Sequence, residues 1–240
     1  MMQASGFFHI HSGWSYDSEL GLEQIRESCL ANGAKFAVLA EHSRDFPWGR
    51  LDEYLAAVKA ISDYDFLFLS GLEYEFSGIH LVAFGCERYL PHEDINECIA
   101  ACRDGGGGVV WAHPRKRDFR SLKSWASRLD GIEVWSARYG CRYLPDPGLC
   151  RRLKELRKTF PDLRGYGALD AHGIRDFRGP RLSLNIDVLC GESLLAELKK
   201  GKFKIEHKGI SIPSSGQPGW ARGLLHLFYG GYRFLDWIVP

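Results

Sequence analysis

Short apolar runs alternate with amphipathic stretches along the whole chain of 240 residues. The apolar runs are typical of buried strands. They predict strands at 6–10, 36–40, 66–69 with 72–74, 79–84, 109–112, 132–135, 165–169 and 203–205. Apolar residues at three- and four-residue steps, such as Leu22, Ile25 and Cys29, predict amphipathic helices between the strands. The predicted helices cover 22–31, 51–61, 95–103, 149–158 and 193–200.

This alternation predicts an α/β fold with a mainly parallel sheet. The number of strands fits a closed or nearly closed barrel better than two separate domains. The glycine run 105–108 has two interpretations. A loop that cradles phosphate needs a helix directly after it, whereas the apolar residues 109–112 that follow are typical of a strand. The run is better interpreted as a turn that ends helix 95–103 and leads into that strand.

Composition narrows the class of protein. Hydrophobic residues make up 45% of the chain and aromatic residues 13%, which is typical of a soluble globular protein and argues against disorder. The 31 Lys and Arg residues nearly balance the 30 Asp and Glu residues, leaving a formal charge of +1. A dedicated nucleic-acid binder normally has a basic excess, so we expect no long nucleic acid as a partner, although a local basic patch stays compatible with this balance.

Seven cysteines without a C-x-x-C pair indicate reduced thiols in a reducing compartment. The first residues lack the charged and long apolar regions of a signal peptide, and no stretch approaches the roughly 20 apolar residues of a membrane span. The apolar C-terminal stretch 223–240 is interrupted by Arg233 and Asp236 and predicts a packed closing helix. We therefore expect a cytoplasmic protein without a membrane span; the sequence makes no prediction of its oligomeric state.

The position of the histidines points to chemistry. Six of the nine lie at or next to the end of an apolar run, and most have a carboxylate nearby. These histidines are His9, His11, His42, His80, His113 and His172, and the carboxylates are Asp17, Glu41, Glu73, Glu133 and Asp170. Strand ends of a parallel α/β barrel converge on one face, so these side chains are expected around a single pocket.

Imidazole and carboxylate ligands suit Zn, Mn or Fe, and their number exceeds what one ion takes, which predicts a multinuclear centre. Each residue also has a structural alternative. A histidine at a strand end can be a hydrogen-bonded core residue, and Glu41 and Asp170 can cap helices or form ion pairs. His92, His207 and His226 lack this context, so we predict surface or packing roles for them.

The ordered motifs resemble those of the polymerase and histidinol phosphatase (PHP) superfamily over about residues 7–175. The motifs are H-I-H-S at 9–12 with Asp17, E-H-S at 41–43, G-L-E at 71–73, H-L-V-A-F-G at 80–85, A-H-P at 112–114, G-I-E-V-W at 131–135 and L-D-A-H at 169–172. The resemblance implies a single domain over 1–240 with a distorted seven-stranded (β/α) barrel similar to a TIM barrel. It also implies two or three divalent metal ions.

The resemblance further implies three groups of metal ligands, the first two of which share Glu73. They are His9, His11, Glu73 and Asp170 for the first ion, Glu73, His80 and His113 for the second, and Asp17, His42 and His172 for the third. Glu133 matches a position that supports a ligand without touching the metal. Two departures stand out: Glu41 replaces the usual Asp of a T-D-H motif, and Ser136 stands where relatives often have Asn.

The resemblance therefore implies a metal-dependent phosphoesterase that hydrolyses a phosphate ester with a metal-activated water. The expected substrate is a small phosphomonoester, a nucleotide or an oligonucleotide end. Asp170 or His172 would handle the proton. Arg44, Arg115, Lys116 and Arg138 are the candidates to contact the phosphate oxygens, with Arg favoured for bidentate contact. No G-x-S-x-G or Cys/His motif calls for a covalent nucleophile.

Two other functions are compatible with these residues. The chain could be a metal-binding scaffold or regulatory module without catalysis, or it could hydrolyse a non-phosphate ester or an amide with the same centre. All nine expected ligand positions hold residues that can bind a metal, which favours an active enzyme.

Overall fold

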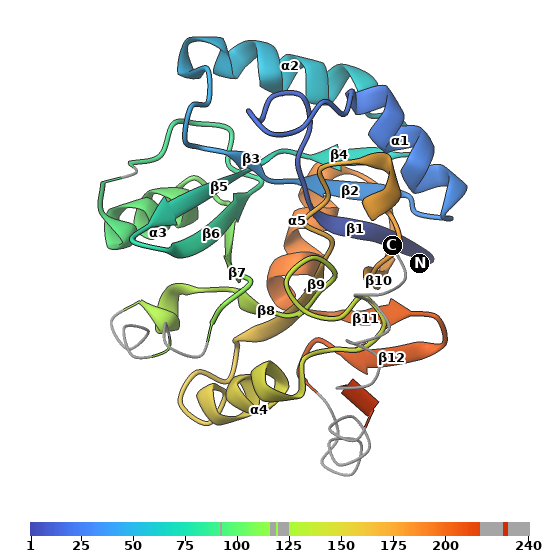
Figure 1. Cartoon of the computed structure of the whole chain (residues 1–240). Coiled ribbons are helices and arrows are strands. Elements are labelled where there is room, and N and C mark those ends of the chain that lie inside the picture. The colour runs from blue at the N-terminus through green and yellow to red at the C-terminus, as the bar shows by residue number, and fades with distance from the viewer. Residues whose placement is uncertain (92, 116–118, 120–124, 217–227, 230–240) are drawn as a thin grey trace.

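The computed structural model describes residues 1–91, 93–115, 119, 125–216 and 228–229 (Figure 1). Within these ranges the chain is a mixed α/β structure, which confirms the predicted class. Its α-helices are α1 (Leu22–Ala31), α2 (Leu51–Ile61), α3 (Ile95–Asp104), α4 (Pro147–Leu156) and α5 (Gly191–Lys200). None of these helices combines the length and apolarity that crossing a bilayer requires.

The described strands form two six-stranded sheets. The first sheet has the order β12 (Ile210–Pro213), β11 (Phe203–His207), β10 (Arg181–Ile186), β1 (Met2–Ile10), β2 (Phe36–Leu39) and β4 (Leu67–Leu69). The second has the order β3 (Glu41–His42), β5 (Gly71–Phe76), β6 (Ile79–Phe84), β7 (Gly108–Ala112), β8 (Gly131–Ser136) and β9 (Arg164–Ala168).

The expectation of a mainly parallel sheet is wrong for these strands, and the described strands do not form one closed barrel. The pairs β1–β2, β2–β4, β3–β5, β7–β8 and β8–β9 are parallel, but β5–β6, β6–β7 and the run β1–β10–β11–β12 are antiparallel. The reason lies in the connections. A parallel pair needs a long crossover, whereas the two-residue turn Ser77–Gly78 joins β5 directly to β6.

The two sheets meet beside β1. The segment after β9 runs along β1, where the Leu169 amide donates to the Phe8 carbonyl over 2.9 Å and the His11 amide donates to the Ala171 carbonyl over 2.9 Å. Strands β3 and β5 follow β2 and β4 after one intervening residue each, so the chain passes from one sheet to the other without a break in direction. This junction gathers several strand ends at one place.

Large aromatic side chains fill the space between the sheets. The Phe8 ring meets the Phe84 ring edge-on at 5.5 Å and lies 5.1 Å from the Tyr166 ring, and all three are fully buried. Each contributes about 1.5–3 kcal/mol through burial. The packing leaves no room for a methyl group at Gly131, where an added Cβ would lie 2.4 Å from the Tyr166 ring. The aromatic core beneath the strand ends is therefore tightly packed.

Local signals set the ends of the helices. Helix α4 begins at Pro147, two residues before the predicted start, because the Asp146 side chain accepts hydrogen bonds from the Gly148 and Leu149 amides. Helix α3 ends at Asp104, and the turn that follows contains Gly106 with a φ of 83°. The glycine run 105–108 is thus a turn that ends the helix, as predicted.

Candidate metal centre

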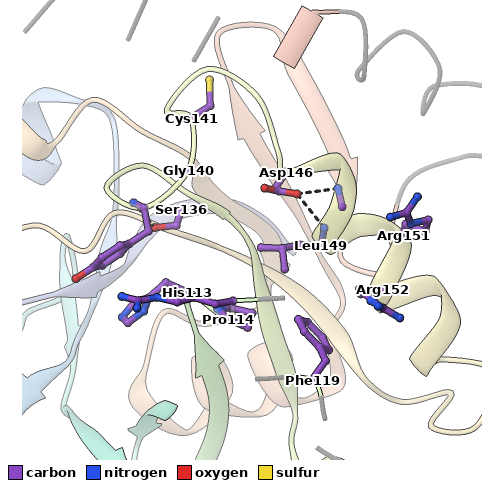
Figure 2. Close-up of a pocket in the computed structure, with 13 residues that line it drawn as sticks. His113, Pro114, Phe119, Ser136, Gly140, Cys141, Asp146, Leu149, Arg151 and Arg152 are labelled. Carbon is purple, nitrogen blue, oxygen red and sulfur yellow. Dashed lines mark hydrogen bonds between the residues drawn. The ribbon is translucent and has the colours of Figure 1, made fainter. Parts of the chain in front are cut away.

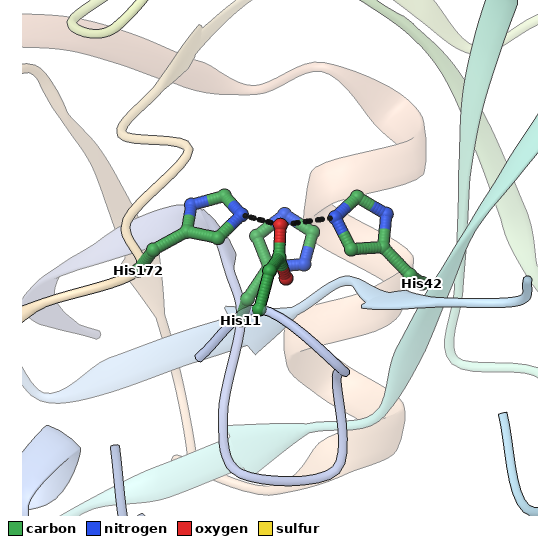
Figure 3. A group of neighbouring side chains, drawn as sticks. His11, His42 and His172 are labelled. Carbon is green, nitrogen blue, oxygen red and sulfur yellow. Dashed lines mark ion pairs between the residues drawn. The ribbon is translucent and has the colours of Figure 1, made fainter. Parts of the chain in front are cut away.

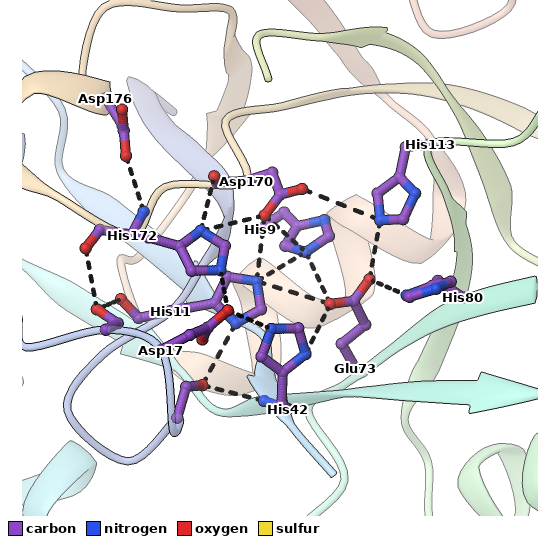
Figure 4. A network of polar contacts seen from close by, with 12 residues as sticks. His9, His11, Asp17, His42, Glu73, His80, His113, Asp170, His172 and Asp176 are labelled. Carbon is purple, nitrogen blue, oxygen red and sulfur yellow. Dashed lines mark hydrogen bonds and ion pairs between the residues drawn. The ribbon is translucent and has the colours of Figure 1, made fainter. Parts of the chain in front are cut away.

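Nine ionisable side chains from both sheets and their loops point toward one another at the junction of the sheets (Figure 4). They are the nine that the sequence predicts: His9, His11, Asp17, His42, Glu73, His80, His113, Asp170 and His172. Six come from strands or their first following residue, Asp170 and His172 come from the segment after β9, and Asp17 comes from the loop before α1. The structure thus brings the whole predicted set together.

A bulge in β1 places His9 beside His11. The pairing with β2 shifts register between Phe8 and Ile10, and His9 has a φ of 67°. Simple alternation along a strand would put residues two apart on one face. Here the extra residue of the bulge and the end of the strand at Ile10 bring the two rings together, with their Nε2 atoms 3.1 Å apart.

The backbone is strained at three of these positions. His9, His113 and Asp170 all have positive φ values, of 67°, 28° and 55°. Such a conformation costs a non-glycine residue about 1–3 kcal/mol and persists where the surrounding structure enforces it, most often at functional sites. All three lie at or just after the end of a strand, where this backbone conformation turns their side chains toward the group of nine.

Glu73, on β5, lies at the middle of the group. Its Oε1 atom is 3.0 Å from His80 Nδ1 and 3.0 Å from His113 Nε2. Its Oε2 atom faces the other way, 3.2 Å from His42 Nδ1 and 3.5 Å from His9 Nε2. One buried carboxylate therefore joins two sets of imidazoles.

Asp170 follows β9 and faces the same centre. Its Oδ1 atom lies 3.3 Å from His11 Nε2, and its Oδ2 atom lies 4.0 Å from His113 Nε2. The other aspartate, Asp17, lies between two imidazoles, with its Oδ2 atom 3.3 Å from His42 Nε2 and 3.1 Å from His172 Nε2 (Figure 3).

Two buried glutamates support the ring positions. Glu133 Oε1 lies 2.8 Å from His9 Nδ1, and its Oε2 accepts the His113 backbone N–H over 2.8 Å. Glu41 accepts hydrogen bonds of 2.6 Å from the Ser12 and Ser15 hydroxyls, and the Ser15 oxygen lies 3.3 Å from His11 Nδ1. Glu41 thus orients His11 through a serine, even though it departs from the usual motif.

Burial and charge shift the titration of these groups strongly. Burial opposes ionisation of Glu73, but His9 and the hydrogen bonds from neighbouring histidines hold its pKa well below the usual range. The pKa of His9 is raised, since Asp170, Glu73 and Glu133 outweigh the cost of burial. Burial lowers the pKa of His11 to about 4. The site therefore favours ionised carboxylates beside at least one imidazole that keeps a lone pair at neutral pH.

The donor set fits divalent metal ions. Glu133 holds the Nδ1 atom of His9, so the Nε2 atom of the same ring faces the centre. Metal-binding histidines are commonly oriented by such a carboxylate on the second ring nitrogen. Four groups of possible ligand atoms lie within 4.8 Å of one another. They are His11, Asp17, His42 and His172; His9, His113 and Asp170; His9, His11 and Glu73; and Glu73, His80 and His113. Nitrogen and oxygen donors in such groups suit borderline ions like Zn, Mn and Fe.

A cavity of about 310 Å³ borders His113 and extends toward the start of α4 (Figure 2). Its walls include Arg115, Ser136 and Tyr139, and the Tyr139 ring lies 4.2 Å from the His113 ring. Arg138 is exposed on the loop after β8. Arg44 is exposed and pairs with Asp45 over 3.6 Å, and Lys116 lies outside the described residues.

No family model matches the sequence, and no curated protein matches it. Solved structures do match its fold. One is a two-domain protein from Bacteroides vulgatus that contains a predicted PHP-like metal-dependent phosphoesterase, with a TM-score of 0.66 and 14% identity over 88% of this chain. Another is the lesion-specific endonuclease PfuEndoQ from Pyrococcus furiosus, with a TM-score of 0.58 and 14% identity over 85% of this chain.

The chain spans 66% of the Bacteroides protein and 58% of the endonuclease. At this identity the likeness is one of fold: the chain has the fold of PHP-like metal-dependent phosphoesterases. The His, Asp and Glu groups at the junction of the sheets are able to hold divalent metal ions in that fold.

Proposed function

We propose that this protein is a metal-dependent phosphoesterase whose centre holds two or three divalent ions. The observation that carries the proposal is the position of Glu73, a buried carboxylate whose two oxygens face separate sets of imidazoles. A carboxylate between neighbouring ligand groups is what a centre with more than one ion requires. The fold shared with PHP-like phosphoesterases supports the same assignment.

We assign the ligands by their contacts. Glu73, His80 and His113 would hold one ion, and His9 and Asp170, with His11 or His113, would hold a second. His42, Asp17 and His172, with His11, would hold a third. Bound ions would activate a water and offset the charge of the phosphoryl oxygens. We propose Zn, Mn or Fe on the basis of the nitrogen and oxygen donors.

Residues of the chain would bind the substrate and move the proton. Asp170 Oδ1 lies 3.4 Å from His172 Nδ1, so this pair can pass a proton between carboxylate and imidazole. Arg115 lines the cavity beside His113, and Arg138 lies two residues after β8, outside the cavity lining. We propose that both arginines contact the phosphate oxygens. Glu73 and Asp170 are buried, so bulk water does not screen the negative charges of these two carboxylates.

The cavity beside His113 suits the leaving group of a small phosphate ester, a nucleotide or an oligonucleotide end. Its volume of about 310 Å³ is at the lower end for small-molecule sites. We further propose that residues 1–240 act as one domain in the cytoplasm, with no long nucleic acid as a substrate.

A release assay tests the proposal. The purified protein, with Zn, Mn or Fe supplied in turn, is offered phosphomonoesters, nucleotides, bis(p-nitrophenyl) phosphate and carboxylic esters. We expect release of phosphate from the monoesters and nucleotides, or of p-nitrophenol from the diester, that is lost on chelation and in Asp170→Asn. Asp176→Asn, which alters the acceptor of the His172 and Gly173 amides, should keep part of the activity. Hydrolysis of the carboxylic esters without hydrolysis of any phosphomonoester or phosphodiester would reject the phosphoesterase assignment in favour of another hydrolase.

A further inference from the structure

A second pocket, here called the cationic pocket, has a volume of about 510 Å³ and shares no residue with the metal centre. It is formed by β1, the end of α1, the loop before α4, the loop before β10 and the turn between β11 and β12. Its lining residues are Phe7, Asn32, Arg142, Tyr143, Phe177, Arg178, Gly179, Arg181, His207 and Lys208.

The charge of this lining is one-sided. Three arginines and a lysine contribute, and none of the described lining residues is acidic. The neighbouring carboxylate, Glu206, accepts a hydrogen bond from the Ser211 hydroxyl over 3.0 Å. Four cations around one concave surface repel one another and attract an anion with more than one charge.

The pKa of His207 responds to burial and to the positive charge of the pocket. Its ring hydrogen-bonds to the Gly179 carbonyl, whereas its Nε2 atom is buried and has no hydrogen-bond partner. Burial, followed by the charges of Lys208, Arg181 and Arg142, lowers the pKa of His207 to about 4. A buried ring nitrogen that makes no hydrogen bond destabilises the folded state. A bound anion would remove this cost, because it can accept hydrogen bonds from the protonated ring and from the three neighbouring cations together.

The shape of the pocket is fixed on two sides. The Phe7 and Phe177 rings pack edge-on at 5.8 Å and form an apolar wall. Lys208 Nζ lies 4.7 Å from the centre of the Tyr143 ring, and Arg181 Nη1 donates to the Asn32 carbonyl over 2.8 Å. These contacts hold two of the cations in place before any ligand arrives, which reduces the entropy lost on binding.

We propose that the cationic pocket is a binding site for a small anion that carries two linked phosphate groups, such as a pyrophosphate moiety. A single phosphate would satisfy only part of the four cations, whereas a diphosphate can share its charge among Arg142, Arg178, Arg181 and Lys208. The bound anion turns the Nε2 atom of His207 into a donor. This site is separate from the proposed metal centre, so the inference does not depend on the proposed function.

The test is a titration with inorganic pyrophosphate, followed by NMR of the His207 ring, which is assigned from the signal lost in His207→Gln. The local signal separates this pocket from any binding of pyrophosphate at the metal centre. We expect saturable binding that raises the pKa of His207 by at least one unit. We also expect binding at least tenfold tighter than that of inorganic phosphate.

The variants Arg181→Gln and Lys208→Gln should each weaken binding at least tenfold. Lys204→Gln is the matched control, because Lys204 is an exposed cation on β11, the strand that carries His207, and lies outside the pocket. This variant should bind like the wild type. Equal weakening in all three variants, no change in the His207 signal, or tighter binding of a short single-stranded oligonucleotide than of pyrophosphate would overturn the proposal. Circular dichroism confirms that each variant folds.

Discussion

Replacing Glu73 with glutamine tests the centre at its most connected point. The substitution keeps the shape of the side chain and removes one negative charge that faces His80 and His113 through one oxygen and His42 and His9 through the other. Because the carboxylate and the His9 ring are buried, bulk water cannot take the place of the lost charge beside His9.

The size of the effect follows from this burial. Removing one partner of a buried charged pair costs about 3–5 kcal/mol. At about 1.4 kcal/mol per factor of ten, this predicts that apparent metal affinity falls between about 100-fold and 4,000-fold. The loss should affect two ions together, since Glu73 belongs to two of the ligand groups.

Competition with a chromogenic chelator measures this affinity directly. The matched control is Glu75→Gln, the same chemical change two residues along β5 at an exposed side chain, which should bind metal like the wild type. A Glu73→Gln protein that keeps both wild-type metal content and wild-type phosphate release would refute the bridging role.

Three further predictions concern the surroundings of the centre and the stability of the fold. Glu133→Gln removes the carboxylate that holds His9 and should reduce metal affinity about 10–100-fold, measured by the same competition, and an unchanged affinity would mean that the ring is held by other contacts. Gly131→Ala places a methyl group against a buried ring on β9 and should lower the free energy of unfolding by about 1–3 kcal/mol in a urea titration, with Gly191→Ala, which has open space around it, as the control. The pKa of His207 is lowered in the folded state to about 4 from 6.5, mainly by burial, so the unfolded state binds the proton more readily and stability falls as the pH drops from about 6.5 to 4. In His207→Gln this part of the pH dependence should be missing, and an identical pH profile of the urea midpoint would contradict the buried-ring explanation.

Much of the candidate centre was predictable because it depends on strand ends. Residues such as His42 and His113 follow apolar runs, and the ends of successive strands meet at one junction. Helices α1 and α2 match their predicted bounds, because the spacing of their apolar residues follows the helical period over the whole helix. The local sequence pattern was therefore sufficient to predict those features that depend on a single strand or helix.

The features that the sequence did not predict depend on contacts between residues far apart in the chain. The bulge at His9 depends on how β1 pairs with β2, and nothing in the sequence around it marks a residue with positive φ. The role of Glu41 depends on Ser12 and Ser15, which lie 29 and 26 residues earlier in the chain.

Strand β10 (Arg181–Ile186) was also not predicted, although Leu182, Leu184 and Ile186 alternate with polar residues in the pattern of a half-buried strand. The antiparallel pairs that β10 forms with β1 and β11 are one reason why the described strands form two sheets rather than a closed barrel.

The central claim is that the nine side chains at the junction of the sheets hold metal ions that the enzyme uses. Its most direct test is metal quantification by mass spectrometry on the purified protein, combined with phosphate release before chelation, after chelation and after metal is restored. The account predicts two or three equivalents of Zn, Mn or Fe and activity that disappears and returns with the metal. Less than one equivalent after incubation with each metal, or phosphate release that chelation leaves unchanged, would contradict it.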